Sequence, residues 1–241
     1  MNKINAVYVS LVALVVSIVT LVMCIVCCKK GGDSASVEQA LNDNPEMIIQ
    51  AMQNYETRQR EEAQKKAQEL LAQSEEELTK NPADGFLGNA EGDVVLVEFF
   101  DFSCGYCHKI YPVLKNVIAK NNNLKVVAKP LAFLSPMSKY AAKAALAAKE
   151  QNKFAEVYTA VFEINGPMTE AKIDEAVVKA GVDLEKLKTD MESEKVNKIL
   201  NDTSALAAKI QVNGVPTLIL NGKIIQTLDE GVLQDAINQA K

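Results

Sequence analysis

The chain has 241 residues, of which 48% are hydrophobic and 24% charged, so it can form a sizeable core and is not disordered throughout. Its net charge of −5 excludes a general nucleic-acid-binding protein, because such a protein needs a basic face. The single His, His108, excludes any site built on two or more His ligands, and the five Cys are too unevenly placed for a disulfide scaffold.

The first predicted element is a membrane helix within residues 1–30. Residues 6–28 carry no charge and are flanked by Lys3 and Lys29. A run of about 20 apolar residues spans the hydrocarbon core as a helix, whereas the apolar region of a signal peptide has about 7–15 residues. The sequence therefore favours an uncleaved anchor. A cleaved signal peptide is the alternative, because residues 34–36 (Ser-Ala-Ser) fit a cleavage site made of small residues. Positive charges are nearly balanced across the segment, so they do not decide its orientation.

A long helix is predicted next, within a helical region at residues 31–80. Asn44 is suited to be an N-cap and Pro45 to be the first helical residue, and neither Gly nor Pro follows until about residue 79. Apolar residues recur at helical spacing near both ends of this segment: Ile48, Met52, Tyr55, Ala63, Ala67, Leu70, Leu71 and Leu78. One helix cannot bury such a stripe alone. A solvated linker helix and an oligomerisation stalk joining two or three chains both remain open.

Residues 81–241 are predicted to be the main domain, and a cysteine pair follows its first clear strand. Residues 94–100 form a β-branched and aromatic run typical of a strand buried on both faces. Ser103 is the expected N-cap of the helix that follows. The positive end of that helix and its unpaired N–H groups stabilise a thiolate at Cys104, which we expect to be the exposed nucleophile. Cys107, one turn inward, is expected to be the buried resolving thiol.

The motif has two other interpretations, a haem attachment site and a zinc site. Cys-x-x-Cys-His, ending here at His108, is also the attachment pattern of c-type haem, but the strand before it does not suit a small helical haem domain. A structural zinc site needs four ligands, and Cys104, Cys107 and His108 supply only three. Thiol–disulfide exchange remains the favoured chemistry, and no cofactor is predicted.

The remaining elements indicate an α/β sheet interrupted by a helical insertion. A second strand is predicted at residues 124–129, and the insertion at about residues 135–211. Predicted helices within the insertion cover residues 138–149, 154–163, 170–180, 184–191 and 195–210. Strands at 212–220 and 223–227, joined by an Asn-Gly hairpin turn, and a last helix at 231–240 complete the chain.

Two separated motifs carry a family resemblance. The run from Glu98 to Cys107 reads EFFDFSCGYC, and Gly214-Val215-Pro216-Thr217 follows, with Pro216 112 residues after Cys104. Together they resemble the DsbA family of thioredoxin-fold disulfide oxidoreductases over about residues 83–241. The resemblance implies an α/β, thioredoxin-like fold with a helical insertion, here preceded by a long helix and a transmembrane helix.

The resemblance also implies roles for single residues. The Val215–Pro216 bond is expected to be cis and to lie beside the Cys pair, with the Val215 backbone free to pair with a substrate strand. A Glu98–Lys129 pair is expected beneath the Cys pair, where it tunes proton transfer to the inner sulfur, and His108 is a third expected tuning residue. An edge-facing Glu98 with a solvated Lys129 is the alternative.

The residues between the cysteines shift the expected direction of exchange. Gly105-Tyr106 departs from the oxidase pattern and is similar to the bacterial isomerases of the DsbC type. Residues 44–76 resemble the stalks of trimeric DsbA-like proteins associated with copper tolerance. We therefore expect a disulfide isomerase or oxidoreductase acting on exported client proteins, as a dimer or trimer.

The anchor and the resemblance together imply a place in the cell. We expect a single-pass protein of the bacterial inner membrane, with its catalytic domain in the periplasm and a membrane redox partner. Two hypotheses from other classes remain open: a periplasmic Cu(I)-binding thiol chaperone using Cys104 and Cys107 as soft ligands, and a surface structural protein with a vestigial Cys pair.

Overall fold

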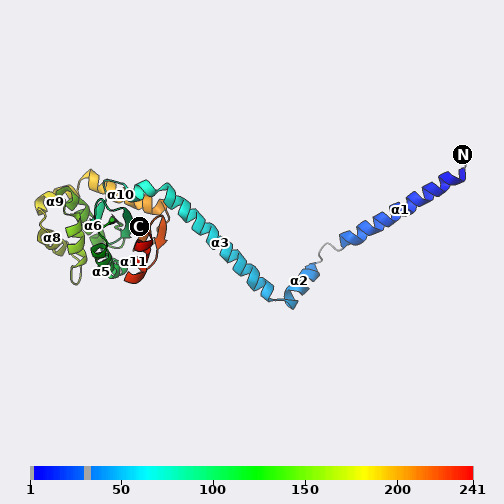
Figure 1. Cartoon of the computed structure of the whole chain (residues 1–241), viewed down its shortest axis with the longest axis horizontal. Helices are drawn as coiled ribbons and strands as arrows, with labels where there is room; N and C mark the ends of the chain where they lie inside the picture. Colours follow the sequence, from blue (N-terminus) through cyan, green and yellow to red (C-terminus); the bar gives the residue numbers. More distant parts are fainter. Residues whose placement is uncertain (1–2, 30–33, 241) are drawn as a thin grey trace. The chain divides into compact units, whose positions relative to one another are not determined.

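A computed structural model describes residues 3–29 and 34–240, and the side chains of residues 11–25 and 37–240. The chain divides into two compact units, Met1–Glu62 and Ala63–Lys241. The first unit contains helix α1 (Lys3–Lys29), helix α2 (Ser34–Asp43) and the beginning of helix α3 (Glu46–Gln73). Figure 1 shows these helices in sequence colours from blue to cyan.

The predicted membrane anchor coincides with α1. Its backbone is helical from Lys3 to Lys29, and the described side chains from Leu11 to Ile25 include many exposed apolar groups. Among the residues that the structure describes, no helix meets the combined requirement of length and apolarity for crossing a membrane. The side chains of residues 1–10 and 26–30, which belong to the predicted anchor, lie outside the described residues.

The long helix predicted to follow Asn44 is interrupted at Ser74. Helix α3 ends at Gln73 and a short helix, α4 (Glu75–Thr79), follows. Leu71 and Leu78 are each 2% exposed and pack with residues of the sheet, so the end of the long helix belongs to the second unit. That unit consequently begins at Ala63, earlier than the expected boundary at residue 81, because these leucines need the sheet face for their burial.

The second unit is built on a five-stranded sheet in the order β1-β3-β2-β4-β5. Its strands are β1 (Gly85–Gly88), β2 (Val94–Phe100), β3 (Leu124–Pro130), β4 (Thr217–Leu220) and β5 (Lys223–Ile225). Strands β2 and β3 are parallel and the other neighbours are antiparallel. The Asn221-Gly222 turn between β4 and β5 has positive φ at both residues, as a two-residue hairpin turn requires. The predicted α/β sheet with a helical insertion is confirmed.

Strand β1 was not predicted from the sequence. It has four residues, with Gly at both ends, and lies antiparallel to the edge of β3. Gly85 is needed there because a Cβ atom at this position would overlap the ring of Phe154. The strand is too short to show an alternating pattern, and its glycines are more typical of a turn.

Helices cover both faces of the sheet. Alternate residues of β2 point to opposite faces. Leu96 and Phe100 share one face with helices α5 (Gly105–Lys120) and α11 (Glu230–Gln239), which lie side by side in Figure 1. Val97 and Phe99 share the other face with α4 and helix α10 (Glu194–Lys209). The central strand is therefore apolar along its whole length, apart from Glu98.

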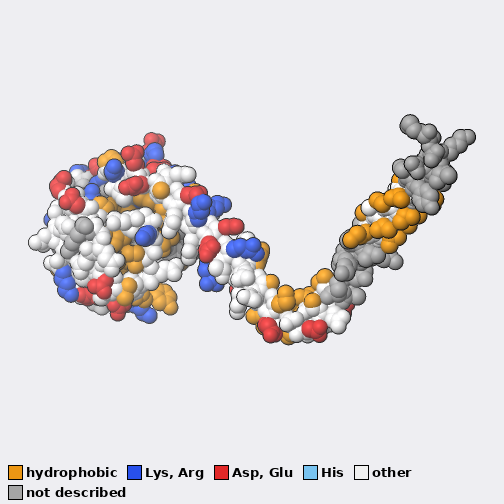
Figure 2. All heavy atoms as spheres, turned by 45° about the vertical axis from the view of Figure 1, so that its right-hand side comes forward, with side chains coloured by type: hydrophobic (Ala, Val, Ile, Leu, Met, Phe, Trp, Pro, Cys, Tyr) orange, Lys and Arg blue, Asp and Glu red, His pale blue; other side chains and the backbone are white. Residues whose placement is uncertain are grey.

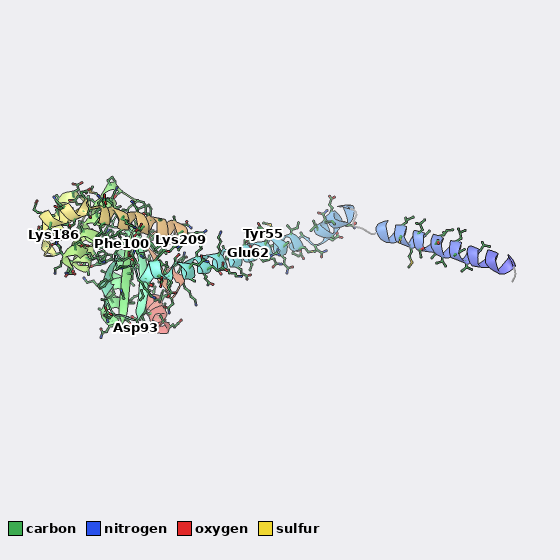
Figure 3. All side chains as sticks on the ribbon, turned by 90° about the horizontal axis from the view of Figure 1, so that it is seen from above. Tyr55, Glu62, Asp93, Phe100, Lys186 and Lys209 are labelled. Atoms are coloured by element: carbon green, nitrogen blue, oxygen red, sulfur yellow. The ribbon has the colours of Figure 1, made fainter. Side chains whose placement is uncertain are left out.

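The insertion is a helical cluster at one end of the sheet. Its helices are α6 (Pro136–Ala148), the 3-10 turn η1 (Lys149–Gln151), α7 (Phe154–Phe162), α8 (Glu170–Lys179), α9 (Leu184–Met191) and α10. Hydroxyl or carboxylate N-caps begin α6, α8, α9 and α10, as local sequence predicts: Ser135, Thr169, Asp183 and Ser193. In Figure 3, Asp93 marks the start of β2, and Phe100 lies at its other end, toward the insertion and Lys186 on α9.

Candidate active site

The cysteine pair lies where strand β2 gives way to helix α5. Cys104 itself is the N-cap of α5, and its sulfur accepts a hydrogen bond from the backbone N–H of Cys107 at 3.4 Å. The expected N-cap, Ser103, was therefore wrong by one residue. The Cys104 sulfur itself therefore receives an N–H group at the positive end of the helix, which favours its thiolate form.

The two sulfurs differ in accessibility. Both cysteines are free thiols; Cys104 is 7% exposed and Cys107 is fully buried. The expected order of exposure is confirmed, although Cys104 is less open than the sequence analysis predicted. Burial raises the pKa of the Cys107 thiol, and the nearby Cys104 sulfur and Glu98 carboxylate raise it further. Cys107 therefore needs a base before it can act as a nucleophile.

Asp101, Ser103 and Ser135 fix the loop that precedes Cys104. The Asp101 carboxylate accepts hydrogen bonds from the backbone N–H groups of Ser103, Phe133 and Leu134. The Ser103 hydroxyl lies 2.7 Å from the hydroxyl of Ser135, at the start of α6. The loop that carries the nucleophile is thereby tied to the loop between β3 and α6. Ser103 serves this network instead of capping α5.

The Val215–Pro216 segment lies against the nucleophile. The Val215–Pro216 peptide bond is cis, as expected. The Cys104 thiol donates a hydrogen bond to the Val215 carbonyl at 3.3 Å, so residues 111 positions apart meet at the site. The segment from residue 212 to 216 forms this loop, and strand β4 consequently begins at Thr217 and not at the predicted residue 212.

A groove adjoins this loop. It has a volume of about 590 Å³ and is lined by Tyr106 from α5, residues 211–218 and residues 224–228. Tyr106 is 59% exposed, so the residue between the two cysteines is available to a bound molecule. An extended peptide crossing Cys104 would meet both the groove and the Val215 backbone.

The expected Glu98–Lys129 pair is absent, and this prediction was wrong. Glu98 lies opposite Ala128 in the parallel register of β2 and β3, so Lys129 points to the other face of the sheet. Glu98 is fully buried, and its Oε2 accepts a hydrogen bond of 2.8 Å from the Tyr158 hydroxyl. Its other oxygen, Oε1, has no partner among the described residues. Burial raises the pKa of Glu98 to about 7, and the Tyr158 hydrogen bond opposes the rise.

Lys129 takes part in a separate buried ion pair. Its ammonium group contacts the Asp84 carboxylate and donates to the Glu77 carbonyl at 2.9 Å. Lys129 is 1% exposed and Asp84 6%. This pair fastens the segment before β1 and the end of α4 to the sheet face away from the cysteines.

His108 follows Cys107 but faces an aromatic cluster. Its Nε2 lies 2.9 Å from the Phe102 carbonyl, and its ring packs edge-on against Phe162 at 5.1 Å. Among the described residues, no three His, Cys, Asp or Glu side chains are grouped to hold a metal ion. The arrangement offers a capped outer thiol, a buried inner thiol and a buried carboxylate, which together suit thiol exchange coupled to proton transfer.

Tyr158, Asp101 and Asp84 were missed by the sequence analysis. A usable signal existed for Tyr158. Phe154, Tyr158 and Phe162 recur every four residues on one predicted helix, and a buried Tyr needs a partner for its hydroxyl. Glu98 was the carboxylate already predicted to be buried. No local signal pointed to the contacts of Asp101 with residues 133–134 or of Asp84 with Lys129, because these partners are distant in the sequence.

Comparison with known proteins matches the region that carries this site to one family. The model of the DSBA-like thioredoxin domain matches residues 95–238. The chain is 26% identical over 151 residues to "Probable disulfide bond formation protein D" of Bacillus anthracis, covering 57% of this chain and 70% of that protein. It is 27% identical over 143 residues to "Na(+)/H(+) antiporter NhaA 3" of Salinispora tropica, covering 58% of this chain but only 22% of the antiporter.

Among solved structures, a thioredoxin-like oxidoreductase from Silicibacter pomeroyi DSS-3 superposes with a TM-score of 0.65. It is 32% identical in sequence, and the match covers 68% of this chain and 96% of that one. The matched region therefore corresponds to nearly the whole of that protein.

Proposed function

The chain belongs to the DSBA-like thioredoxin domain family, and we propose that it is a protein-disulfide oxidoreductase acting on cysteine-containing client proteins. The observation that carries the proposal is the Cys104–Cys107 pair at the start of α5, with the Cys104 thiol against the Val215 carbonyl. No resident cofactor enters the proposal, since the two thiols exchange electrons directly with the disulfide of the client.

The proposed reaction has two steps. The Cys104 thiolate attacks one sulfur of a client disulfide, which breaks and leaves the client bound to Cys104 as a mixed disulfide. Cys107 then gives its proton to a base and attacks the Cys104 sulfur. The Cys104–Cys107 bond forms, the bond to the client breaks, and the client leaves as a thiolate. The client disulfide has gained two electrons and the Cys pair has lost two.

Residues around the Cys pair have further proposed roles. The backbone of Val215, held by the cis bond to Pro216, pairs with the client segment that enters the groove beside Tyr106. Glu98 is the proposed base for Cys107, because it is a buried carboxylate whose charge acts on that thiol. Lys129 has no proposed part in the reaction, since it is paired with Asp84 on the opposite face. His108 supports the start of α5 through the Phe102 carbonyl.

The proposed direction is isomerisation or reduction of client disulfides. Gly105-Tyr106 supports it, since this pair matches the isomerase pattern. In isomerisation, a thiol of the client itself displaces Cys104 and forms a different client disulfide. A reduction potential near −200 mV or lower is expected, whereas a value near −120 mV would indicate a strong oxidant.

Reduction of insulin and refolding of scrambled ribonuclease test this function. The full chain should catalyse both reactions, and Cys104→Ser should abolish both. Tyr106→Ala should leave the reaction with a small dithiol unchanged while weakening catalysis on protein clients. A full chain that binds Cu(I) tightly but catalyses neither reaction would contradict the proposal and favour a copper chaperone.

We also propose that α1 anchors the protein in the bacterial inner membrane, with the catalytic unit in the periplasm and a membrane protein as its redox partner. The support is the uncharged run at residues 6–28, of which α1 forms a continuous helix. Membrane fractionation of the full chain tests it. Recovery in the membrane pellet after a carbonate wash is expected, and release into the supernatant would contradict it.

The first unit supports a proposed dimer or trimer. Met47, Ile48, Met52 and Tyr55 at the start of α3 are 47–60% exposed and form an apolar stripe, visible as hydrophobic side chains in Figure 2. Figure 3 labels Tyr55 and, further along α3, Glu62. Matching stripes on two or three chains would bury these side chains. Light scattering of residues 34–241 should give an oligomer, and Met52→Glu should yield monomers. A monomer at tens of micromolar without substitution would contradict the proposal.

A further inference from the structure

The partner of the buried carboxylate at the site is a tyrosine. We propose that Tyr158 is the positioning residue for Glu98: its hydroxyl holds Oε2 and leaves Oε1 free to exchange a proton with Cys107. The inference rests on the proposed function, because it assigns a partner to the base of the second step. It places the hydrogen-bond partner of this base in the helical insertion, about 50 residues after the Cys pair in the sequence.

The Tyr158 ring is held from several sides. It lies on α7 and is 1% exposed. The Phe162 ring lies at 4.8 Å and the Phe100 ring at 5.1 Å, the latter nearly edge-on, with Phe102 at 5.9 Å. Edge-to-face packing of this kind fixes the orientation of a ring. The hydroxyl therefore has a fixed position at the Glu98 carboxylate.

In the described part of the chain, the strands and helix α5 around Glu98 place no positively charged side chain beside its carboxylate, so the Tyr158 hydroxyl is its main partner. The neighbouring strands place Ala128 of β3 and Leu218 of β4 opposite Glu98, and neither side chain is titratable. Helix α5 contributes Cys104, Cys107 and Tyr111 to this side of the sheet. None of these groups carries a positive charge.

The two other residues expected to tune the site, Lys129 and His108, make their contacts elsewhere. Lys129 is on the other face with Asp84, and the exposed His108 contacts the Phe102 carbonyl. The Tyr158 hydrogen bond is thus the one contact between described residues that stabilises ionised Glu98 against the effect of burial. The strength of the Tyr158 hydroxyl as a donor therefore sets the pKa of Glu98, and with it the pH above which Glu98 is ionised and can accept a proton.

The proton balance of the second step follows from this arrangement. Ionised Glu98 takes the proton of the Cys107 thiol, and the resulting thiolate attacks the mixed disulfide at Cys104. The Cys104–Cys107 bond forms as the bond to the client breaks, and the leaving sulfur carries the electron pair. Glu98 later returns its proton to solvent. Tyr158 keeps its own proton throughout, since burial and the charge of Glu98 raise its pKa well above the usual value.

Tyr158→Phe tests the inference, because it removes the hydroxyl and retains the ring. Reduced protein is mixed with a disulfide-bonded peptide between pH 5 and 9. Acid quenching and mass spectrometry then follow the decay of the mixed disulfide at Cys104. In the unmodified protein, the rate of mixed-disulfide decay should rise with pH and reach half of its maximum near pH 7. In Tyr158→Phe the midpoint should move up by about one to two pH units, the effect of losing one hydrogen bond to a charged group.

Tyr111→Phe is the matched control. Its ring is 6.1 Å from that of Tyr158, but its hydroxyl donates to Glu163 at the exposed surface at 2.7 Å. This variant should keep the midpoint of the unmodified chain. Glu98→Gln should slow the decay at neutral pH and remove the pH-dependent rise. An unshifted midpoint in Tyr158→Phe, or equal shifts in both Tyr variants, would overturn the role of Tyr158.

Two further results separate the possible failures. If the unmodified chain forms no mixed disulfide at any pH, the proposed function fails and not merely the role of Tyr158. If Tyr158→Phe does not fold, carbon NMR of Glu98 in the unmodified reduced protein decides. A titration midpoint near 7 supports a carboxylate held in this environment. A midpoint at the ordinary value of about 4.3 would overturn the inference.

Discussion

Replacing Lys129 by Met should destabilise the catalytic unit in a pH-dependent manner. Lys129 is 1% exposed, and its ammonium contacts the buried Asp84 carboxylate. Without the ammonium, Asp84 would be an uncompensated buried charge, and it would become protonated instead. Burial already raises the pKa of Asp84 more than the charge of Lys129 lowers it.

Protonation of Asp84 sets an upper limit to the loss of unfolding free energy in Lys129→Met. Holding a carboxyl group neutral at pH 7, when its unfolded pKa is about 4, costs about 4 kcal/mol, and at pH 5 only about 1.5 kcal/mol. The folded pKa is raised in the variant, so its stability falls as pH rises above about 4. We expect a loss of about 3–4 kcal/mol at pH 7, within the range for breaking a buried ion pair.

Urea unfolding of residues 63–241 at pH 5 and pH 7 measures this effect. The double variant Lys129→Met/Asp84→Leu should recover most of the stability and lose the pH dependence, because no buried charge remains. Lys198→Met is the control, since Lys198 pairs with Asp202 on the exposed surface of α10 and should change little. A loss below about 1 kcal/mol in Lys129→Met at pH 7, or one equal at both pH values, would refute the reasoning.

Three further changes test other contacts by the same unfolding assay. Gly85→Ala should cost about 1–3 kcal/mol, because the new methyl group overlaps the Phe154 ring, whereas Gly105→Ala, which has open space, should change stability little. Ser135→Ala should cost about 1 kcal/mol through loss of the α6 cap, and an unchanged midpoint would contradict the capping role. Glu98 has a folded pKa of about 7, so its ionisation should lower stability progressively between about pH 4.5 and 7. Glu98→Gln should therefore gain up to about 3 kcal/mol relative to the unmodified chain at pH 8, and equal pH profiles would count against the raised pKa.

Elements with a continuous local pattern were predicted well from the sequence. Strand β2 was placed at its observed bounds because its seven residues are apolar or β-branched apart from Glu98. Helix α9 was also placed correctly, beginning after the Asp183 cap. The Cys pair, the cis Val215–Pro216 bond and their meeting at one site followed from two distant motifs and the family resemblance.

The sequence-based predictions were wrong where tertiary contacts determine the local structure. The partner of Glu98 depended on the register of two parallel strands, and an offset of one residue moves Lys129 to the opposite face. The break at Ser74 follows from docking Leu71 and Leu78 on the sheet, which no periodicity shows. Strand β1 is too short to have a pattern of its own and exists because it pairs with β3.

Trapping of the mixed disulfide tests the central claim most directly. Cys107→Ser is mixed with a disulfide-bonded client peptide, and the products are mapped by mass spectrometry. The account predicts a stable adduct on Cys104, because the thiol that would release the client is missing. Under the same conditions Cys104→Ser should give no adduct, since the remaining sulfur of Cys107 is buried and lacks the cap. Equal adducts on both variants, or an adduct on Cys107 alone, would contradict the assignment of Cys104 as the attacking thiol.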